Sequence, residues 1–410
     1  MLKYLNIQTL ANSEMNKYNE LKTNANYLKE LIINDCEATF ENLELLLKYT
    51  PNLKIFSIFI ISDMNMFDGI RWQKLIESLL KHLIIFKFYF QDEKFEKPME
   101  KLNKFQRFQN DFYHKQHQWY TNLEIYTRTS TIYTIPYERK NYELTFNTNK
   151  HGYLWMKNSK VFDNVKTLTL TTTKLIANNA EYYFKNIESL ILRCYSYENF
   201  YENDDKSDLN STKIELLRTI VNLSNIKHLT IDNDIYLTSS LFLDLLKELP
   251  NVSSLKIDED QLMKIFDNIE LCEYLNENIK KLEIFSAQFF DKRIFLNKIN
   301  ILLSQVFPNI EQFTCDYMKR VDDLLVILKQ CSKLSIIKCE GISKSVNSWI
   351  EINASRLDVY LDFEYVNEDN DDDEYDYDDE DEYDYDDDDK YDYDEDEEQI
   401  KRSLLNRGLI

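Results

Sequence analysis

The chain has 410 residues, of which 43% are hydrophobic and 14% aromatic, and its formal net charge is −23. Residues 368–398 contain 23 acidic residues and one basic residue, so this short segment carries −22 and the rest of the chain is nearly neutral. A neutral body lacks the clustered lysines and arginines that bind phosphate backbones, which argues against a nucleic-acid partner.

A short apolar pattern recurs from the first residues of the chain onward. It has an apolar residue, two mostly polar residues, an apolar residue, one intervening residue and a last apolar residue, as at Leu28, Leu31 and Ile33. The last step has a period of two, which is typical of a short strand with one buried face. From Ile226 onward the copies begin 26, 27, 31 and 24 residues apart, close to the 20–29 residues of leucine-rich repeats. The clear copies begin at Leu28, Leu53, Leu83, Val165, Ile187, Ile226, Val252, Ile279, Ile310 and Leu334.

The segments between these strands have helical periodicity. Residues 41–49, 238–249 and 322–331 each place leucines on one stripe, and the second of them opens with Thr238, a good N-cap residue. Proline follows such helices at positions 51, 250 and 308, where a helix is expected to stop. Residues 1–366 are therefore predicted to form an α/β, leucine-rich-repeat-like solenoid, a curved parallel sheet backed by helices. Since the first strand-like piece begins directly after Met1, we expect another chain or an upstream domain to cover that end.

The repeat spacing breaks between residues 92 and 160. A polar, helix-like run at 100–118 is followed there by strand-like pieces rich in aromatic residues. One interpretation is an inserted or degenerate repeat whose aromatic side chains are core. The other is a surface that binds a partner, because irregular insertions on a rigid scaffold often carry recognition. The candidate partner-binding residues are Trp119, Tyr133, Tyr137 and Trp155.

Residues 367–399 form an acidic tail in which three consecutive eight-residue copies each contain Tyr-Asp-Tyr. Repulsion between like charges and the lack of aliphatic residues predict disorder. The tail is either a solubilising segment or a polyanion that binds basic proteins such as histone tails. It is followed by a short basic and apolar terminus, residues 400–410. The candidate modification sites, where phosphorylation would add charge, are Tyr375, Tyr377, Tyr383, Tyr385, Tyr391 and Tyr393.

Residue types that carry chemistry are sparse. The four glycines are too dispersed for a phosphate-binding loop or a nucleophile elbow. His114 and His117 are three residues apart, but they lack a nearby acidic third ligand and make a weak metal site. The six cysteines form no C-x-x-C pair and are expected to be buried, reduced thiols. We therefore predict no enzyme, no metal and no cofactor.

Neither a signal peptide nor a membrane-spanning stretch is indicated. The N-terminus has no continuous apolar region, and the longest apolar stretches are far too short to cross a bilayer. The expected location is intracellular, cytoplasmic or nuclear, without a membrane partner.

Several pieces of the sequence resemble the leucine-rich region of the F-box proteins that are abundant in bdelloid rotifers. The pieces are 51–58, 69–76, 79–88, 117–120 and 133–137, and the resemblance extends over about residues 28–361. It implies a repeat fold that recognises substrate proteins for a cullin ubiquitin ligase. Members usually begin with an F-box that docks onto a Skp-type adaptor, and this chain shows no such start.

Two functional hypotheses follow. The first is a non-enzymatic protein-interaction scaffold, an F-box-type substrate-recognition protein or ubiquitin ligase adaptor that lacks its F-box. The alternative is an acidic-tail binder of basic proteins, similar to histone chaperones. The sequence does not identify the protein partner.

Overall fold

A computed structural model describes residues 2–11, 24–61, 64–92, 98–125, 129–144, 149–152, 160–171, 182–193, 211–232, 235, 237–264, 268–285, 306–318, 320–357 and 359–365. Trp155, Cys194 and the acidic tail with its six tyrosines lie outside these residues. The described chain divides into two compact units. The first contains Met1–Glu138 and Asn147–Val161, and the second contains Arg139–Phe146 and the described residues from Phe162 onward.

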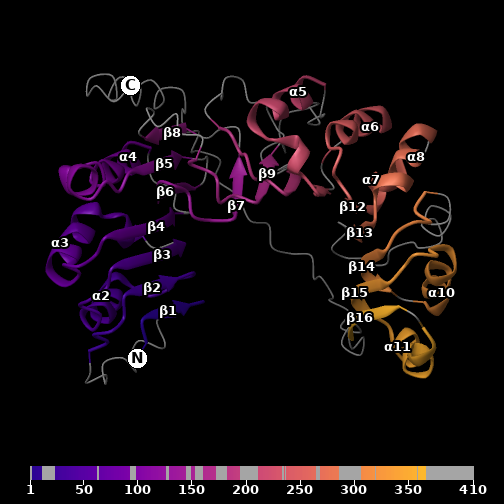
Figure 1. Cartoon of the computed structure of the whole chain (residues 1–410), viewed down its shortest axis with the longest axis horizontal. Coiled ribbons are helices and arrows are strands. Elements are labelled where there is room, and N and C mark those ends of the chain that lie inside the picture. The colour runs from indigo at the N-terminus through magenta and orange to yellow at the C-terminus, as the bar shows by residue number, and fades with distance from the viewer. Residues whose placement is uncertain are drawn as a thin grey trace, which may run out of the picture. The chain divides into compact units, whose positions relative to one another are not determined.

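The first unit is a seven-stranded sheet in the order β1-β2-β3-β4-β6-β5-β8. Strands β1 to β4 are parallel and lie in register, and helices α2, α3 and α4 lie on one side of them (Figure 1). The elements are β1 (Tyr4–Ile7), β2 (Glu30–Ile33), α2 (Phe40–Lys48), β3 (Ile55–Ile61), η1 (Met64–Phe67), α3 (Gly69–Leu79), β4 (Ile85–Asp92), α4 (Pro98–Gln106), the π-helix η2 (Phe112–Gln116), β5 (Thr121–Ile125), β6 (Ser130–Thr134) and β8 (Asn149–Gly152).

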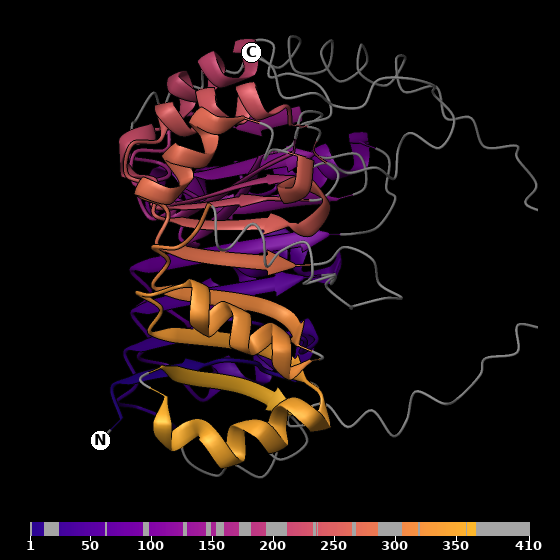
Figure 2. The same cartoon turned by 90° about the vertical axis from the view of Figure 1, so that its right-hand side faces the viewer.

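The second unit is a nine-stranded sheet in the order β16-β15-β14-β13-β12-β11-β10-β9-β7, and every pairing is parallel. Figure 2 shows α10 and α11 (orange and yellow) lying over the strands of the same colour. The elements are β7 (Asn141–Leu144), β9 (Thr167–Thr171), β10 (Ser189–Arg193), α5 (Ser211–Ile220), η4 (Leu223–Asn225), β11 (His228–Ile231), α6 (Ser239–Glu248), β12 (Ser254–Asp258), α7 (Glu259–Lys264), α8 (Ile269–Asn278), β13 (Lys281–Phe285), β14 (Gln312–Met318), α10 (Val321–Gln330), β15 (Ile336–Ile342), α11 (Lys344–Asn353), η5 (Ala354–Arg356) and β16 (Tyr360–Tyr365).

The predicted parallel sheet backed by helices is thus confirmed, and each of the ten clear copies of the apolar pattern leads into a strand. The predicted capping residue Thr238 accepts a hydrogen bond from the backbone N–H of Leu241 at the start of α6. Between residues 92 and 160 the pairing changes. Strand β6 is antiparallel to both β4 and β5, and β5 is antiparallel to β8.

One backbone carbonyl in the turn before a parallel strand accepts hydrogen bonds from two successive N–H groups at the start of the neighbouring strand. The carbonyl of Lys29, for example, accepts from the N–H groups of both Lys54 and Ile55, at 2.8 and 3.0 Å. Because the accepting residue always precedes a strand, these bonds fix the register from one strand to the next. The carbonyls that accept two such bonds belong to Lys3, Lys29, Lys54, Lys140, Lys166, Glu188, Lys227, Ser253, Lys280 and Glu311.

Asparagine side chains make a second connection between neighbouring turns. An asparagine directly before the first apolar residue of the pattern donates its Nδ2 to a backbone carbonyl in the preceding turn. Asn52 donates to Asn26 at 3.0 Å, and Asn251 donates to Ser224 at 2.7 Å. Asn186 and Asn225 do the same toward Asp163 and Lys185. These amides satisfy turn carbonyls that no strand ladder reaches.

The two units have different cores. In the first unit, Trp72 of α3 is fully buried with its ring 5.0 Å from Phe40, 5.2 Å from Phe86 and 5.6 Å from Phe90, and its Nε1 donates to the Met66 carbonyl at 2.8 Å. From β11 to β13 in the second unit the core is mainly aliphatic. Fully buried residues there include Leu229, Leu245, Leu255, Leu271 and Leu282.

Among the described residues, no helix is long and apolar enough to cross a membrane. The described cysteines are free thiols, and Cys36, Cys315, Cys331 and Cys339 are buried.

Candidate interaction surface

Within the described residues, each sheet has one face covered by helices and one face, here called the open face, that no helix covers (Figure 1). In the first unit the residues of β3 alternate strictly, with Phe56 and Ile58 buried toward the helices and Ile55 and Phe59 on the other face. The register of the four parallel strands then lines up the outward side chains in rows across the sheet. The row nearest the strand starts contains Tyr4, Glu30, Ile55 and Ile85.

Part of this open face is apolar, and Asn6, Gln8 and Asn34 form a polar cluster beside it. Tyr4 is 47% exposed and Ile85 36% exposed, and Ile84 beside them is 63% exposed. Ile32 stands in the second row, and Ile61 at the far end of β3 is 41% exposed. Contiguous exposed apolar residues of this kind typically mark a surface that contacts another protein segment.

Aromatic side chains form a third row on the same face. Phe59 of β3 stacks on Tyr89 of β4 at 4.9 Å between ring centroids, and Tyr89 stacks on Tyr133 of β6 at 6.4 Å. Tyr137 meets Tyr133 edge-on at 5.0 Å and Tyr89 edge-on at 6.0 Å. Phe59 and Tyr89 are half-buried, whereas Tyr133 and Tyr137 are buried. Rigid aromatic groups at half-buried positions are the residues that most often anchor protein interfaces.

A polar network holds the tyrosines of this aromatic row. The Tyr133 hydroxyl donates to Glu124 Oε1 at 2.7 Å and accepts from Asn122 Nδ2 at 2.8 Å. The Tyr89 hydroxyl donates to Gln91 Oε1 at 3.0 Å. Glu124 is only 1% exposed. These bonds fix the ring orientations, so the row is preorganised for contact.

Lysines line the edge of this face where the strands begin. Lys3, Lys29 and Lys54 occupy the same position before β1, β2 and β3, as their shared backbone bonds show. Lys3 and Lys54 are exposed and Lys29 is half-buried, with its Nζ 3.5 Å from the Asn52 carbonyl. In the described part of the chain no carboxylate pairs with these three side chains. We call Lys3, Lys29 and Lys54 the lysine rim.

The open face of the second unit is polar instead. Its outward positions are mostly hydroxyl or charged, for example Thr169, Thr230 and Thr314 in one row. The charges are largely paired within the face, as between Arg193 Nε and Asp232 Oδ2 at 2.9 Å. Further cross-strand ion pairs join Lys256 with Glu283 and Lys338 with Asp362.

Three lysines at the strand starts of the second unit are paired with carboxylates, whereas Lys140 before β7 has no carboxylate partner among the described residues. Lys166 lies 2.7 Å from Glu188, Lys227 lies 3.5 Å from the other oxygen of Glu188, and Lys280 lies 3.7 Å from Glu311. The Lys166 hydrogen bond, more than any other cause, lowers the pKa of the exposed Glu188 carboxyl. These pairs leave little net charge at that edge.

The structure separates the residues that the sequence proposed for partner binding. Tyr133 and Tyr137 lie together in the aromatic row of the open face. Trp119 lies in the core on the opposite side, 5.7 Å from Phe86, with its Nε1 donating to the Ile84 carbonyl at 3.1 Å. Trp155 is outside the described residues.

Sequence reasoning missed the larger part of this surface, namely Ile55, Phe59, Ile85 and Tyr89. The signal was available, because these residues occupy the intervening positions of the strand pattern, where polar residues are expected on a solvated face. In the second unit the equivalent positions are mostly polar, with exceptions such as Ile191, Ile336 and Tyr360.

The histidines do not form a metal site with other described residues. No group of three potential ligands is found in the described part of the chain. Burial lowers the pKa of His114 to about 4, against a smaller upward effect of Asp111. Burial also lowers the pKa of His117, whose ring stacks on Trp119 at 4.0 Å. Both imidazoles are held in the neutral form by packing.

Two cysteines are close together in the second unit. Cys315 and Cys339 are register partners on β14 and β15 with their sulfurs 3.5 Å apart, and both are buried. The hydrogen bond with Cys339, followed by burial, raises the pKa of the Cys315 thiol, and burial raises that of Cys331 to about 11. A thiol with a raised pKa is a poor nucleophile, so we interpret these cysteines as packing residues of the core.

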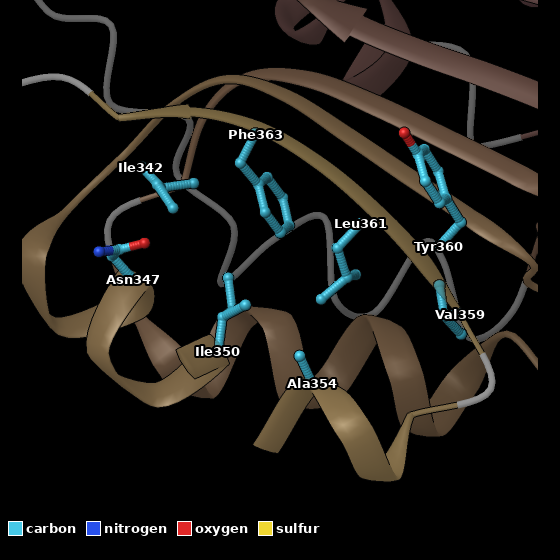
Figure 3. Close-up of a pocket in the computed structure, with 8 residues that line it drawn as sticks. All are labelled: Ile342, Asn347, Ile350, Ala354, Val359, Tyr360, Leu361 and Phe363. Atoms are coloured by element: carbon cyan, nitrogen blue, oxygen red, sulfur yellow. The ribbon is translucent and has the colours of Figure 1, made fainter. Parts of the chain in front are cut away.

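A pocket of about 350 Å³ lies between α11 and β16. Leu361 and Phe363 point from the strand toward Ile350 of the helix (Figure 3). The lining is apolar apart from the amide of Asn347 and the phenol of Tyr360. It offers hydrophobic contact at the last described strand and no acid, base or nucleophile for catalysis.

Comparison of the chain with protein-family models gives no match, and comparison with curated proteins gives no match either.

Proposed function

We propose that this chain is a non-enzymatic protein-interaction scaffold, built as a leucine-rich-repeat-like solenoid, and that it recognises its partner through the open face of the first unit. The observation that carries the proposal is the apolar and aromatic character of that face, with Ile55, Phe59, Ile85 and Tyr89 in register on neighbouring strands. The doubled turn bonds and the asparagine contacts support the repeat architecture, since each unit packs on its neighbours.

Within this proposal the chain is an F-box-type substrate-recognition protein without its F-box. The support is the resemblance in sequence together with the repeated strand-and-helix units. The apolar face supplies the contact area that such recognition requires, and the tyrosine network keeps that face rigid.

The test is quantitative affinity purification with the full chain and two surface variants. The double variant Ile55→Asn, Ile85→Asn alters the open face of the first unit, and Thr169→Asn, Thr230→Asn is the matched change on the second. We expect the first variant to lose the partners that the parent recovers and the second to keep them. Equal recovery by both variants would contradict the proposal. Cullin or Skp-type subunits among the lost partners would support the ligase role.

The alternative function is binding of basic proteins by the acidic tail, similar to histone chaperones. It is favoured by one observation, that residues 368–398 carry −22 of the −23 net charge. It predicts binding that weakens steeply with salt and disappears when the chain ends at Val366. Binding that is insensitive to salt would exclude it.

A further inference from the structure

The acidic segment, residues 368–398, has an unusual combination of side chains. Apart from acidic residues, one asparagine and one lysine, it contains only tyrosines. A surface that binds it must therefore place cations for the carboxylates directly beside apolar area for the tyrosine rings. We infer that the open face of the first unit, together with the lysine rim, is a docking site for the chain's own acidic segment.

Charge distinguishes this face from its counterpart in the second unit. The lysine rim has no carboxylate partner within the described residues, so its charge is available to an incoming anion. Lys166, Lys227 and Lys280 of the second unit already contact Glu188 or Glu311. An acidic segment would have to compete with those bonds there, whereas at the lysine rim it gains new ones.

The distribution of apolar residues also favours the first face over the second. The row beside the lysine rim contains Tyr4, Glu30, Ile55 and Ile85, and the aromatic row begins with Phe59. The equivalent row of the second unit is polar from Thr167 to Gln312. It ends with Ile336 and Tyr360, where Ser335 and Val359 rather than lysines precede the strands. The first face therefore combines apolar residues with the lysine rim, and this combination favours contact with tyrosine rings there.

The length of an extended copy of the acidic repeat is compatible with the width of the face. In an extended Tyr-Asp-Tyr the two rings project to one side and the carboxylate between them to the other. At about 3.3 Å per residue an eight-residue copy spans about 26 Å, while the parallel strands β1 to β4 span about 14 Å at about 4.8 Å each. The face is not accessible beyond β4, because every residue of β6 is buried. One copy thus crosses the face, and the other two raise its effective concentration.

The inference rests on the proposed binding role of this face and adds its regulation. The docked segment covers the same residues that a partner would contact. A partner must therefore displace it, and the apparent affinity falls by the fraction of chains whose face is already covered.

The test is zero-length carbodiimide coupling of the full chain, which joins lysine and carboxylate groups that are in contact, followed by mass spectrometry. We expect linkages from residues 368–398 to Lys3, Lys29 and Lys54, and a strong decrease in 1 M salt, where screening shortens to about 3 Å. Linkages found equally at Lys166, Lys227 and Lys280, or none at the lysine rim, would overturn the inference. In a mixture of isotopically labelled and unlabelled chains, linkages between the two would show that a second copy supplies the segment, and would also overturn it.

A matched pair of variants supplies an independent readout. A glutamate-specific protease should cleave the acidic segment several-fold faster in Lys3→Gln, Lys29→Gln, Lys54→Gln than in the parent. The control Lys166→Gln, Lys227→Gln, Lys280→Gln should be cleaved at the parent rate. Unchanged cleavage in the first variant would contradict docking. Neither measurement needs an external partner, so failure of the docking is distinguishable from failure of the proposed function.

Discussion

The two units use the same strand-and-turn geometry with different side chains. Facing the helices, the first unit packs large aromatic rings around Trp72, while the second combines an aromatic cluster that includes Phe184 with leucines such as Leu255. Facing outward, the first unit presents isoleucine, phenylalanine and tyrosine, and the second presents threonine, serine and ion pairs. Outward positions are not constrained by the core, so their residue types report what each face contacts. The difference is what the proposed binding role of the first face predicts.

The largest expected effect is a loss of stability in the first unit when its central core residue is removed. Replacing Trp72 with alanine removes a fully buried ring that contacts Phe40, Phe86 and Phe90, and it leaves the Met66 carbonyl without its donor. Such a deletion costs about 3–5 kcal/mol. We expect urea unfolding to show this loss in the free energy of unfolding of the first unit.

The matched change in the second unit is Leu255→Ala, which costs about 2–5 kcal/mol. Hydrogen exchange of β3 should report on the first unit and hydrogen exchange of β12 on the second. If Trp72→Ala weakened the protection of β12 as much as Leu255→Ala does, the units would share one cooperative core and the comparison would fail.

A smaller effect comes from the only described close approach that demands a glycine. A Cβ at Gly69, the first residue of α3, would lie 2.7 Å from the backbone carbon and oxygen of Arg107. The Tyr113 hydroxyl also donates to the Gly69 carbonyl at 2.6 Å. Gly69→Ala should destabilise the first unit by about 1–3 kcal/mol, as overpacking does. Lys74→Ala, on the exposed side of the same helix, is the control and should leave the thermal midpoint nearly unchanged.

Much of the fold was predictable because its signals are local. The period-two ends of the apolar pattern predicted strands, and leucine stripes with Thr238 before them predicted a capped helix. Each strand and each helix has an apolar side, and stacking the strand-and-helix units in parallel buries both sides. The antiparallel pairing of β6 with β4 and β5 was not predictable, since pairing direction depends on contacts far apart in the sequence.

The candidate surface was only half predictable for a related reason. Trp119 and Tyr133 are close in sequence and both aromatic, yet they lie on opposite faces of the structure. Facing depends on the register of each strand, and a shift of one residue exchanges the faces. Composition identified the aromatic region, and only the register showed on which face of the sheet each ring lies.

Acidification should also affect the first unit more than the second. Burial lowers the pKa of His114 to about 4, below the value of about 6.5 in an unfolded chain. Between these values the unfolded state binds more protons, so stability falls as the pH decreases from 6.5 toward 4. We expect a loss of about 2 kcal/mol between pH 7 and pH 5 from this residue. His114→Gln should remove that part of the pH dependence in urea titrations, and an unchanged slope would show that folding does not shift the pKa of His114.

The smallest expected effect concerns the contact that both units share. Asn52→Ala removes the bond to the Asn26 carbonyl in the first unit, and Asn251→Ala removes the bond to the Ser224 carbonyl in the second. Both side chains lie at the surface, where water replaces part of the lost bond, so each change should cost about 0.5–1.5 kcal/mol. Hydrogen exchange should localise the loss to the two strands that follow the broken contact. If Asn251→Ala alone weakened its unit, the asparagine contacts would organise the second sheet, and the first would depend on its aromatic core instead.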